Sequence, residues 1–258
     1  MYSSAISNIS SQVDIFHLPT AKRIYSLPNP GPFKGGMIMA ISLFYHPTTA
    51  NLTVISGYES GHSTVSHLLP SSSSWKTTYI NKSHIQPVLS LDISPSKEFY
   101  VTSSADAILA KHPIPTSQRS AIGAGAGEDL PLKTLQTGHA GQQSLKFRND
   151  GKIFATAGWD SRVRVYSSKA MRELAVLKWH KEGIYGVTFA EVEVEETKAE
   201  KGSTEEGEKE TGAQEKGKEI VRREQNMSVK EERLWKATHA HWLAAGSKDG
   251  KISLWEIY

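Results

Sequence analysis

The alternation of apolar and polar residues predicts short β-strands separated by polar turns along most of the chain. The clearest example is the stretch 138–180, which contains four such strands. The expected strands lie at 144–147, 152–157, 162–166 and 174–177. Polar turns join them, for example Asn149-Asp150-Gly151, and this pattern is typical of an antiparallel meander. We therefore expect this stretch to form one four-stranded sheet.

The same stretch carries polar residues that are typical of one blade of a WD-type β-propeller. His139 precedes the first strand, Thr156 lies on the second, and Asp160 lies in the turn before the third. We expect His139 to donate to Asp160, with Thr156 as a relay and Tyr166 as the covering aromatic residue. A buried carboxylate that lacks hydrogen-bond partners destabilises the fold by several kcal/mol, so we expect these residue types to occur together.

Two further blades contain a similar set. His84 and Asp106 are separated by 22 positions, compared with 21 for His139 and Asp160, which predicts equivalent roles. Thr102 is the expected relay of that blade, and His112 takes the aromatic position. In the last blade the set is His180, Asp249 and Trp255. Ala245 replaces the relay threonine there, so we expect that network to be incomplete.

A hydrolase triad of Ser144, His139 and Asp160 is a competing interpretation. It is disfavoured because His and Asp recur at blade spacing, as a single active site would not. The glycine-rich stretch 123–127 also lacks the preceding strand and following helix of a phosphate-binding loop. The sequence thus predicts no enzyme, no catalytic residue, no cofactor and no metal site.

The whole chain is expected to form an all-β fold, a partial WD40-type β-propeller with about four blades of a seven-bladed ring. The expected blades lie at about 12–27, 37–80, 88–135, 144–178 and 184–258. The first of them begins with its third strand, and residues 1–11 are expected to be disordered. We therefore expect the sequence to be the C-terminal part of a longer protein, or a shortened gene model.

Charge and composition change this picture in two places. Residues 191–233 contain fourteen Glu and nine Lys or Arg, and this composition predicts a charged disordered insertion in the last blade. The remainder is mildly basic. The chain has no cysteine, which excludes disulfides and thiolate zinc sites and favours a reducing compartment. No apolar run approaches the roughly 20 residues of a membrane helix.

Several segments resemble one protein family. They are GYESGH (57–62), QPVLSLDISPSKEFYVTSSAD (86–106), the stretch 138–190 and WLAAGSKDGKISLWEIY (242–258). These segments resemble the fungal ASTRA-associated protein 1 family, which is similar to animal guanine-nucleotide-binding-protein β-subunit-like proteins. The resemblance implies a WD-repeat scaffold subunit of the ASTRA complex, a nuclear assembly linked to chromatin remodelling and to maturation of phosphatidylinositol-kinase-related kinases (PI3K-related kinases). The implied partners are Tel2–Tti1–Tti2-type chaperone factors, AAA+ ATPases and those kinases.

Partner binding is expected at one rim of the propeller. In WD-type blades the residue before the turn aspartate tends to project from that rim, which here singles out Tyr58, Trp159 and Lys248. Tyr and Trp are frequent in interface hot spots. The structural alternative is that Trp159 packs against the neighbouring blade. The competing function is a propeller that binds nucleic acid or a histone tail, which the basic balance of the folded part would permit.

Overall fold

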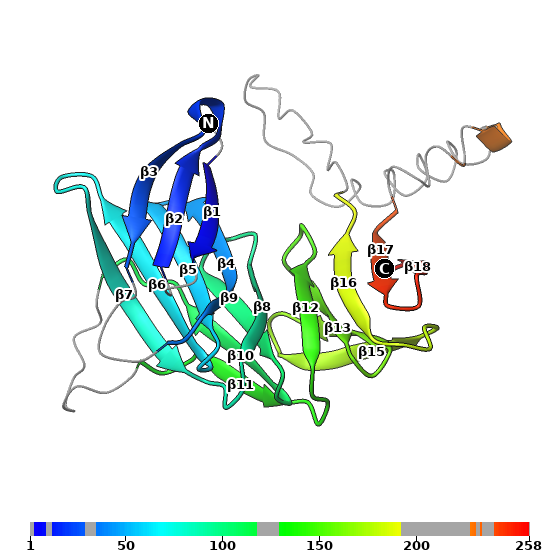
Figure 1. Ribbon diagram of the computed structural model, residues 1–258. Coiled ribbons are helices and arrows are strands. Elements are labelled where there is room, and N and C mark those ends of the chain that lie inside the picture. Colours follow the sequence, from blue (N-terminus) through cyan, green and yellow to red (C-terminus); the bar gives the residue numbers. More distant parts are fainter. Residues whose placement is uncertain are drawn as a thin grey trace, which may run out of the picture. The chain divides into compact units, whose positions relative to one another are not determined.

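The computed structural model describes residues 3–8, 12–28, 35–117, 129–191, 228–230, 233 and 240–257. Within these residues the strands form five sheets that follow one another along the chain (Figure 1). The chain divides into two compact units, Met1–Phe189 with Leu243–Trp255, and Ala190–Trp242 with Glu256–Tyr258. The sites described below lie in the first unit.

Each sheet is built from strands that are consecutive in the sequence. The first contains β1 (Ser3–Asn8), β2 (Gln12–His17) and β3 (Lys22–Leu27), with the 3-10 helix η1 (Leu18–Thr20) after β2. The second contains β4 (Ile38–Tyr45), β5 (Leu52–Tyr58), β6 (His62–Leu69) and β7 (Ser74–Lys82). The third contains β8 (Val88–Ile93), β9 (Phe99–Ser104), β10 (Ile108–Pro113) and β11 (Lys133–Gln136). The fourth contains β12 (Gln142–Phe147), β13 (Ile153–Gly158), β14 (Arg162–Ser167) and β15 (Arg172–Lys178). The fifth contains β16 (Ile184–Phe189), β17 (Trp242–Ser247) and β18 (Ile252–Glu256).

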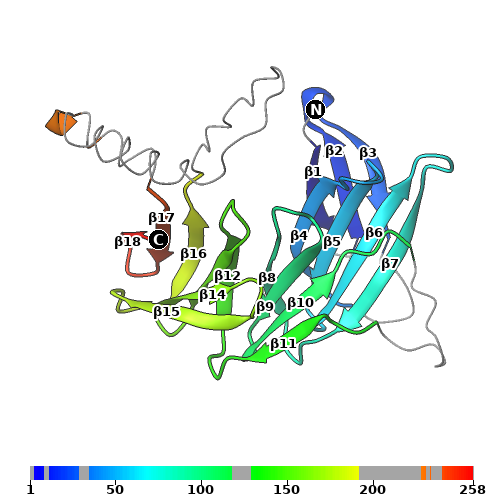
Figure 2. The same cartoon turned by 180° about the vertical axis from the view of Figure 1, so that it is seen from behind.

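The first strands of the later sheets lie next to one another in chain order. Strand β4 contacts β8, β8 contacts β12, and β12 contacts β16 (Figure 1). The opposite view in Figure 2 shows β7, β11 and β15 at the far edges of their sheets. Four-stranded antiparallel sheets that succeed one another through their first strands are the blades of a propeller. The predicted all-β fold, a partial WD40-type β-propeller, is confirmed.

Apolar side chains of neighbouring sheets meet in buried clusters. The cluster between the third and fourth sheets consists of Val101, Leu109, Leu145, Phe147, Phe154, Tyr166 and Met171. The cluster between the second and third sheets consists of Ile55, Val65, Tyr79, Tyr100 and Ile114. Burial of apolar surface contributes about 25 cal/mol per Å², so the contacts between sheets stabilise the fold in addition to the pairing within each sheet.

A recurring β-bulge fixes how residues of the four later sheets correspond. In each sheet the bulge follows a pair that joins the start of the first strand to the end of the second. These pairs are Ile38–Tyr58, Val88–Ser104, Gln142–Gly158 and Ile184–Ser247. The first residues of the following turns are therefore equivalent: Glu59, Ala105, Trp159 and Lys248. The second turn residues are Ser60, Asp106, Asp160 and Asp249.

The same backbone hydrogen bond closes each of these turns. The first turn residue donates its N–H to a carbonyl in the loop that precedes the first strand of its own sheet. The four N–O distances are 2.9 Å (Glu59–Met37), 3.1 Å (Ala105–Pro87), 2.9 Å (Trp159–Gly141) and 3.0 Å (Lys248–Gly183). Each turn therefore lies beside one loop, and we call the edge that these turns and loops form the turn edge.

The N-terminal segment corrects one expectation. Disorder is predicted for residues 1–11, but Ser3–Asn8 form β1, which pairs antiparallel with β2. The short polar segment has too weak an alternation to indicate a strand alone, and the free edge of β2 supplies its partner. The first sheet therefore has three strands. The expected insertion 191–233, apart from 191, 228–230 and 233, and the stretch 123–127 lie outside the described residues.

Candidate functional site

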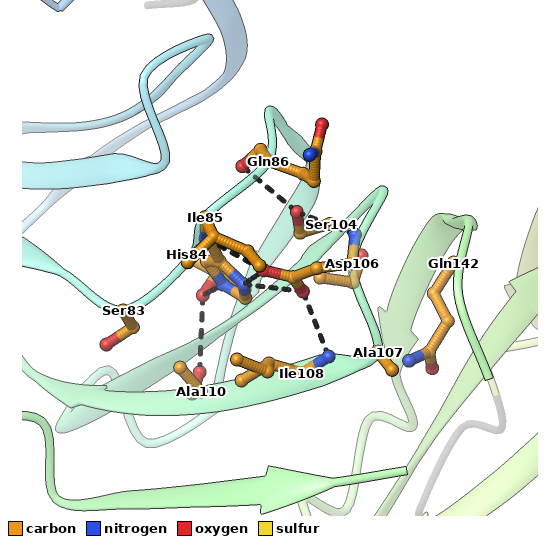
Figure 3. Close-up of polar contacts among 12 residues, drawn as sticks. Ser83, His84, Ile85, Gln86, Ser104, Asp106, Ala107, Ile108, Ala110 and Gln142 are labelled. Carbon is orange, nitrogen blue, oxygen red and sulfur yellow. Dashed lines mark hydrogen bonds and ion pairs between the residues drawn. The ribbon is translucent and has the colours of Figure 1, made fainter. Parts of the chain in front are cut away.

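The third sheet brings His84, Thr102 and Asp106 together in a buried network. The Nδ1 atom of His84 lies 3.1 Å from one Asp106 carboxylate oxygen, and its Nε2 atom lies 2.8 Å from the Thr102 hydroxyl. The backbone amides of Ile85 and Ile108 also donate to Asp106, at 3.0 and 2.9 Å. Figure 3 shows the Asp106 carboxylate between His84 and the backbone of Ile108. Every partner of this carboxylate is thus a donor.

The network continues through the sheet to the neighbouring one. The Thr102 hydroxyl lies 2.9 Å from His112 Nε2, and His112 Nδ1 lies 2.9 Å from the Tyr79 hydroxyl on β7. A carboxylate only accepts, so His84 carries its proton on Nδ1. The Thr102 hydroxyl thus bridges the two imidazoles, and His112 bridges Thr102 and Tyr79. One chain of hydrogen bonds therefore links two sheets.

The ionisation of this network follows from burial and charge. Burial opposes ionisation of Asp106, but the hydrogen bonds from His84 and from the two backbone amides hold its pKa below the ordinary value. Burial lowers the pKa of the His112 imidazole well below its ordinary value, and the neighbouring His84 adds to this effect. His112 is therefore neutral, so one of its two ring nitrogens donates a hydrogen bond in this network and the other accepts one.

The fourth sheet uses Arg164 where the prediction places His139. The Arg164 guanidinium forms a bidentate pair with Asp160, at 3.1 and 2.6 Å, and its Nε lies 3.5 Å from Glu173. The Arg164 side chain is 2% exposed, whereas His139 is exposed to solvent. Burial would raise the pKa of Asp160, and the Arg164 hydrogen bonds more than offset this, so its pKa is lowered. The predicted hydrogen bond from His139 to Asp160 is thereby corrected.

A shift of one residue explains this replacement. His84 lies four residues before Val88, and His180 lies four residues before Ile184; Val88 and Ile184 are the first-strand residues of the pairs that precede the bulge. In the fourth sheet the equivalent residue, four before Gln142, is Gly138. His139 therefore lies one residue too late. Gly158 makes room for the arginine, because a Cβ at Gly158 would lie 2.5 Å from an Asp160 oxygen and 3.4 Å from Arg164 Nη1.

The other two predicted residues of the fourth sheet, Thr156 and Tyr166, are both buried. Thr156 is buried and pairs with Arg164 in the strand register. Tyr166 stacks on Phe154 with ring centroids 5.2 Å apart, and burial raises its pKa to about 12.

The fifth sheet completes its network from a different strand. His180 Nδ1 lies 3.4 Å from Asp249, and His180 Nε2 lies 2.7 Å from the hydroxyl of Ser253 on β18. Ser253 thus supplies the relay that Ala245 on β17 cannot, and the expectation of an incomplete network is corrected. The Trp255 ring contacts His180 edge to face, with centroids 6.2 Å apart.

The three predicted partner-binding residues have different surroundings. Tyr58 is 1% exposed and belongs to the cluster between the first and second sheets, so its expected position on the rim is corrected. The register explains this result: Glu59, not Tyr58, is equivalent to Trp159. Trp159 is 45% exposed, and Lys248 is also exposed on the turn edge.

Trp159 is exposed but held in one orientation. Its indole N–H donates to the side-chain oxygen of Gln143 at 3.0 Å. Its ring covers Gly141, where a Cβ would lie only 2.2 Å from the indole. Gly141 has a φ of 72°, which favours glycine for a second reason. The indole is therefore supported on one face by its own sheet and open to solvent beyond it.

In the part of the chain that the structure describes, no group of three or more His, Cys, Asp or Glu side chains could hold a metal ion. None of the helices described is long and apolar enough to cross a membrane.

Comparisons with known proteins agree with this geometry. The family described as WD domain, G-beta repeat matches residues 130–167 and 236–256. The chain is 48% identical over 249 residues to ASTRA-associated protein 1 of Verticillium alfalfae, covering 96% of this chain and 57% of that protein. The resemblance to the ASTRA-associated protein 1 family is confirmed. The Aspergillus niger protein of that name is 46% identical, with coverage of 96% and 59%.

The similarity extends beyond fungi at a lower level. The chain is 29% identical over 181 residues to guanine nucleotide-binding protein subunit beta-like protein 1 of Mus musculus, covering 70% of this chain and 52% of that protein. The chain thus spans little more than half the length of these curated relatives. The matched repeat 130–167 begins with β11 and ends with β14, so the sequence repeat is offset by one strand from the sheet.

The Arg164–Asp160 pair gives a stability prediction. Asp160→Ala should lower the free energy of unfolding by about 2–4 kcal/mol, because it leaves a buried guanidinium without its carboxylate. Adding Arg164→Leu should recover part of this loss. His139→Ala is the control and should change stability by less than about 0.5 kcal/mol. Urea denaturation measures all three, and a His139→Ala loss equal to that of Asp160→Ala would contradict the assignment.

The lowered pKa of His112 gives a pH prediction. Below its ordinary value of 6.5 the unfolded chain binds a proton that the folded chain does not, so stability should fall as the pH is lowered from 7 to 5. One such histidine contributes a slope of at most about 1.4 kcal/mol per pH unit. The measurement is the midpoint of urea unfolding against pH. His112→Phe should flatten the profile, and an unchanged slope would show that His112 is not held neutral.

Proposed function

We propose that this chain is a non-catalytic WD-repeat scaffold subunit of the ASTRA complex, acting in the nucleus. The relatives named ASTRA-associated protein 1 support this assignment over 96% of the chain. The proposal includes the assembly's links to chromatin remodelling and to maturation of PI3K-related kinases. Its partners would be the Tel2–Tti1–Tti2-type chaperone factors, the AAA+ ATPases and those kinases.

The polar networks support a role without chemistry. In the third, fourth and fifth sheets the Asp carboxylates of the turns face His or Arg side chains and backbone amides. These partners stabilise the turns. The hydroxyl groups next to the two histidines, on Thr102 and Ser253, belong to buried residues, whereas an active site needs a nucleophile that a substrate can reach. Turns presented on rigid sheets are suited to recognition of other proteins.

The exposed indole of Trp159 is the observation that carries this proposal. Its orientation is set by Gln143 and Gly141 before any partner binds, so little conformational entropy is lost on binding. Tryptophan is also enriched among residues that dominate interface energies. The turn edge of the fourth sheet is therefore the surface that we assign to partner binding.

A second candidate, binding of nucleic acid or a histone tail, is favoured only by the basic side chains near this edge. Phosphate contacts would make affinity fall steeply as salt rises. Capture that resists moderate salt would favour the scaffold role, and loss of capture together with recovery on DNA would favour the second.

The test of the proposed function uses Trp159→Ala in the full-length protein, captured from cells by an affinity tag. The variant should weaken association with the ASTRA subunits by about 1–3 kcal/mol while the melting temperature changes little. Leu174→Ala is the matched control, because Leu174 is an apolar residue of similar exposure, 48%, on β15. Quantitative mass spectrometry of the captured subunits gives the readout. Equal recovery from both variants, with normal melting, would place the interaction elsewhere.

A further inference from the structure

The exposed indole of Trp159 continues into the fifth sheet as one surface. Gly183 lies between the two sheets: a Cβ there would be 3.2 Å from the Trp159 carbonyl oxygen and 3.4 Å from the Tyr185 ring. The Tyr185 side chain is 52% exposed. Lys248 joins this surface through its backbone hydrogen bond to Gly183. The Tyr185 ring and the Trp159 backbone thus meet at Gly183, which places two partly exposed aromatic residues on neighbouring parts of the turn edge.

Basic residues lie on the same part of the turn edge. Lys251 lies over the ring of Trp179, 5.8 Å from its centroid, and Trp179 is 55% exposed. Arg162 and Lys178 face each other in the register of β14 and β15, at the ends of the strands next to the turn edge. The basic residues of this region are Arg162, Lys178, Lys181, Lys248 and Lys251.

The acidic residues of the same region are fewer and mostly neutralised. Asp160 is paired with the buried Arg164, and Arg162 lies 3.8 Å from it. Asp249 accepts from His180 and, at 3.0 Å, from the backbone amide of Lys251. Glu182 is exposed. The surface therefore carries an excess of positive charge next to its aromatic rings.

We infer that this part of the turn edge binds an acidic linear segment of a partner protein that carries an apolar or aromatic side chain. The inference rests on the proposed function and specifies its partner. The apolar side chain would pack against Trp159 and Tyr185 over Gly183, and carboxylates on either side would pair with Lys248 and Lys251. Charge complementarity of this kind selects the partner and speeds its association.

The spacing of charges favours a peptide over nucleic acid. Glu182 lies among the basic residues and is exposed, so a continuous phosphate backbone along this surface would pass close to its carboxylate. An acidic peptide has separated charges and can leave a neutral residue opposite that carboxylate. The ring of Trp159 already covers Gly141 with one face, which limits base stacking on both faces.

Short random peptides displayed on phage are selected for binding to the full chain. Peptides that also bind the Trp159→Ala variant are removed by counter-selection. The enriched peptides should contain Asp or Glu close to an aromatic or aliphatic residue. One enriched peptide is then synthesised with a fluorophore, and its affinity is measured by anisotropy. The double variant Lys248→Glu, Lys251→Glu should weaken binding about tenfold or more. Lys152→Glu, on the opposite edge of the fourth sheet, is the matched control and should change it less than about twofold.

Each other outcome overturns the inference in a recognisable way. Enriched peptides that depend on Trp159 but lack acidic residues would refute the charge preference and leave the scaffold function intact. A fluorescent DNA oligonucleotide that binds more tightly than any peptide, and depends on Lys248 and Lys251, would identify nucleic acid instead. If no peptide that depends on Trp159 is enriched, this surface is refuted as a peptide site. Failure of the proposed function is seen separately, in the capture of ASTRA subunits.

Discussion

The structure depends on compensating the aspartate carboxylate in the turn between the second and third strands of the third, fourth and fifth sheets. One backbone hydrogen bond holds each of these turns to the preceding loop. Each sheet then meets the cost of that charge differently. The third uses His84, the fourth uses Arg164, and the fifth uses His180 with Ser253. The second sheet has Ser60 at this position and needs no counter-charge.

The three sheets take their counter-charge from different elements. In the third and fifth sheets it is a histidine of the preceding loop. In the fourth sheet it is Arg164 on β14. There the loop before β12 supplies Gly141, which the Trp159 indole covers, and Gln143 on β12 accepts the indole N–H. The ion pair of Asp160 and the oriented indole of Trp159 thus belong to adjacent residues of one turn.

Sequence alone indicates the fold but not the details of the site. Strand alternation and turn residues are local, so the succession of sheets follows from them. The sets around His84 and His180 also follow, because each keeps its position relative to the first strand. Three features depend on register instead: the one-residue offset of His139, the burial of Tyr58, and the hydroxyl of Ser253. A shift of one residue turns a side chain to the other face, and spacing in the sequence cannot resolve it.

We propose the turn edge of the fourth and fifth sheets as the surface that contacts partner proteins. Hydrogen–deuterium exchange of the full-length protein, free and bound within the captured ASTRA complex, is the measurement that tests this assignment. Binding should slow exchange in 138–143, 158–162, 179–185 and 247–251, with little change in the opposite turns at 95–98 and 149–152. Protection confined to those opposite turns would contradict it.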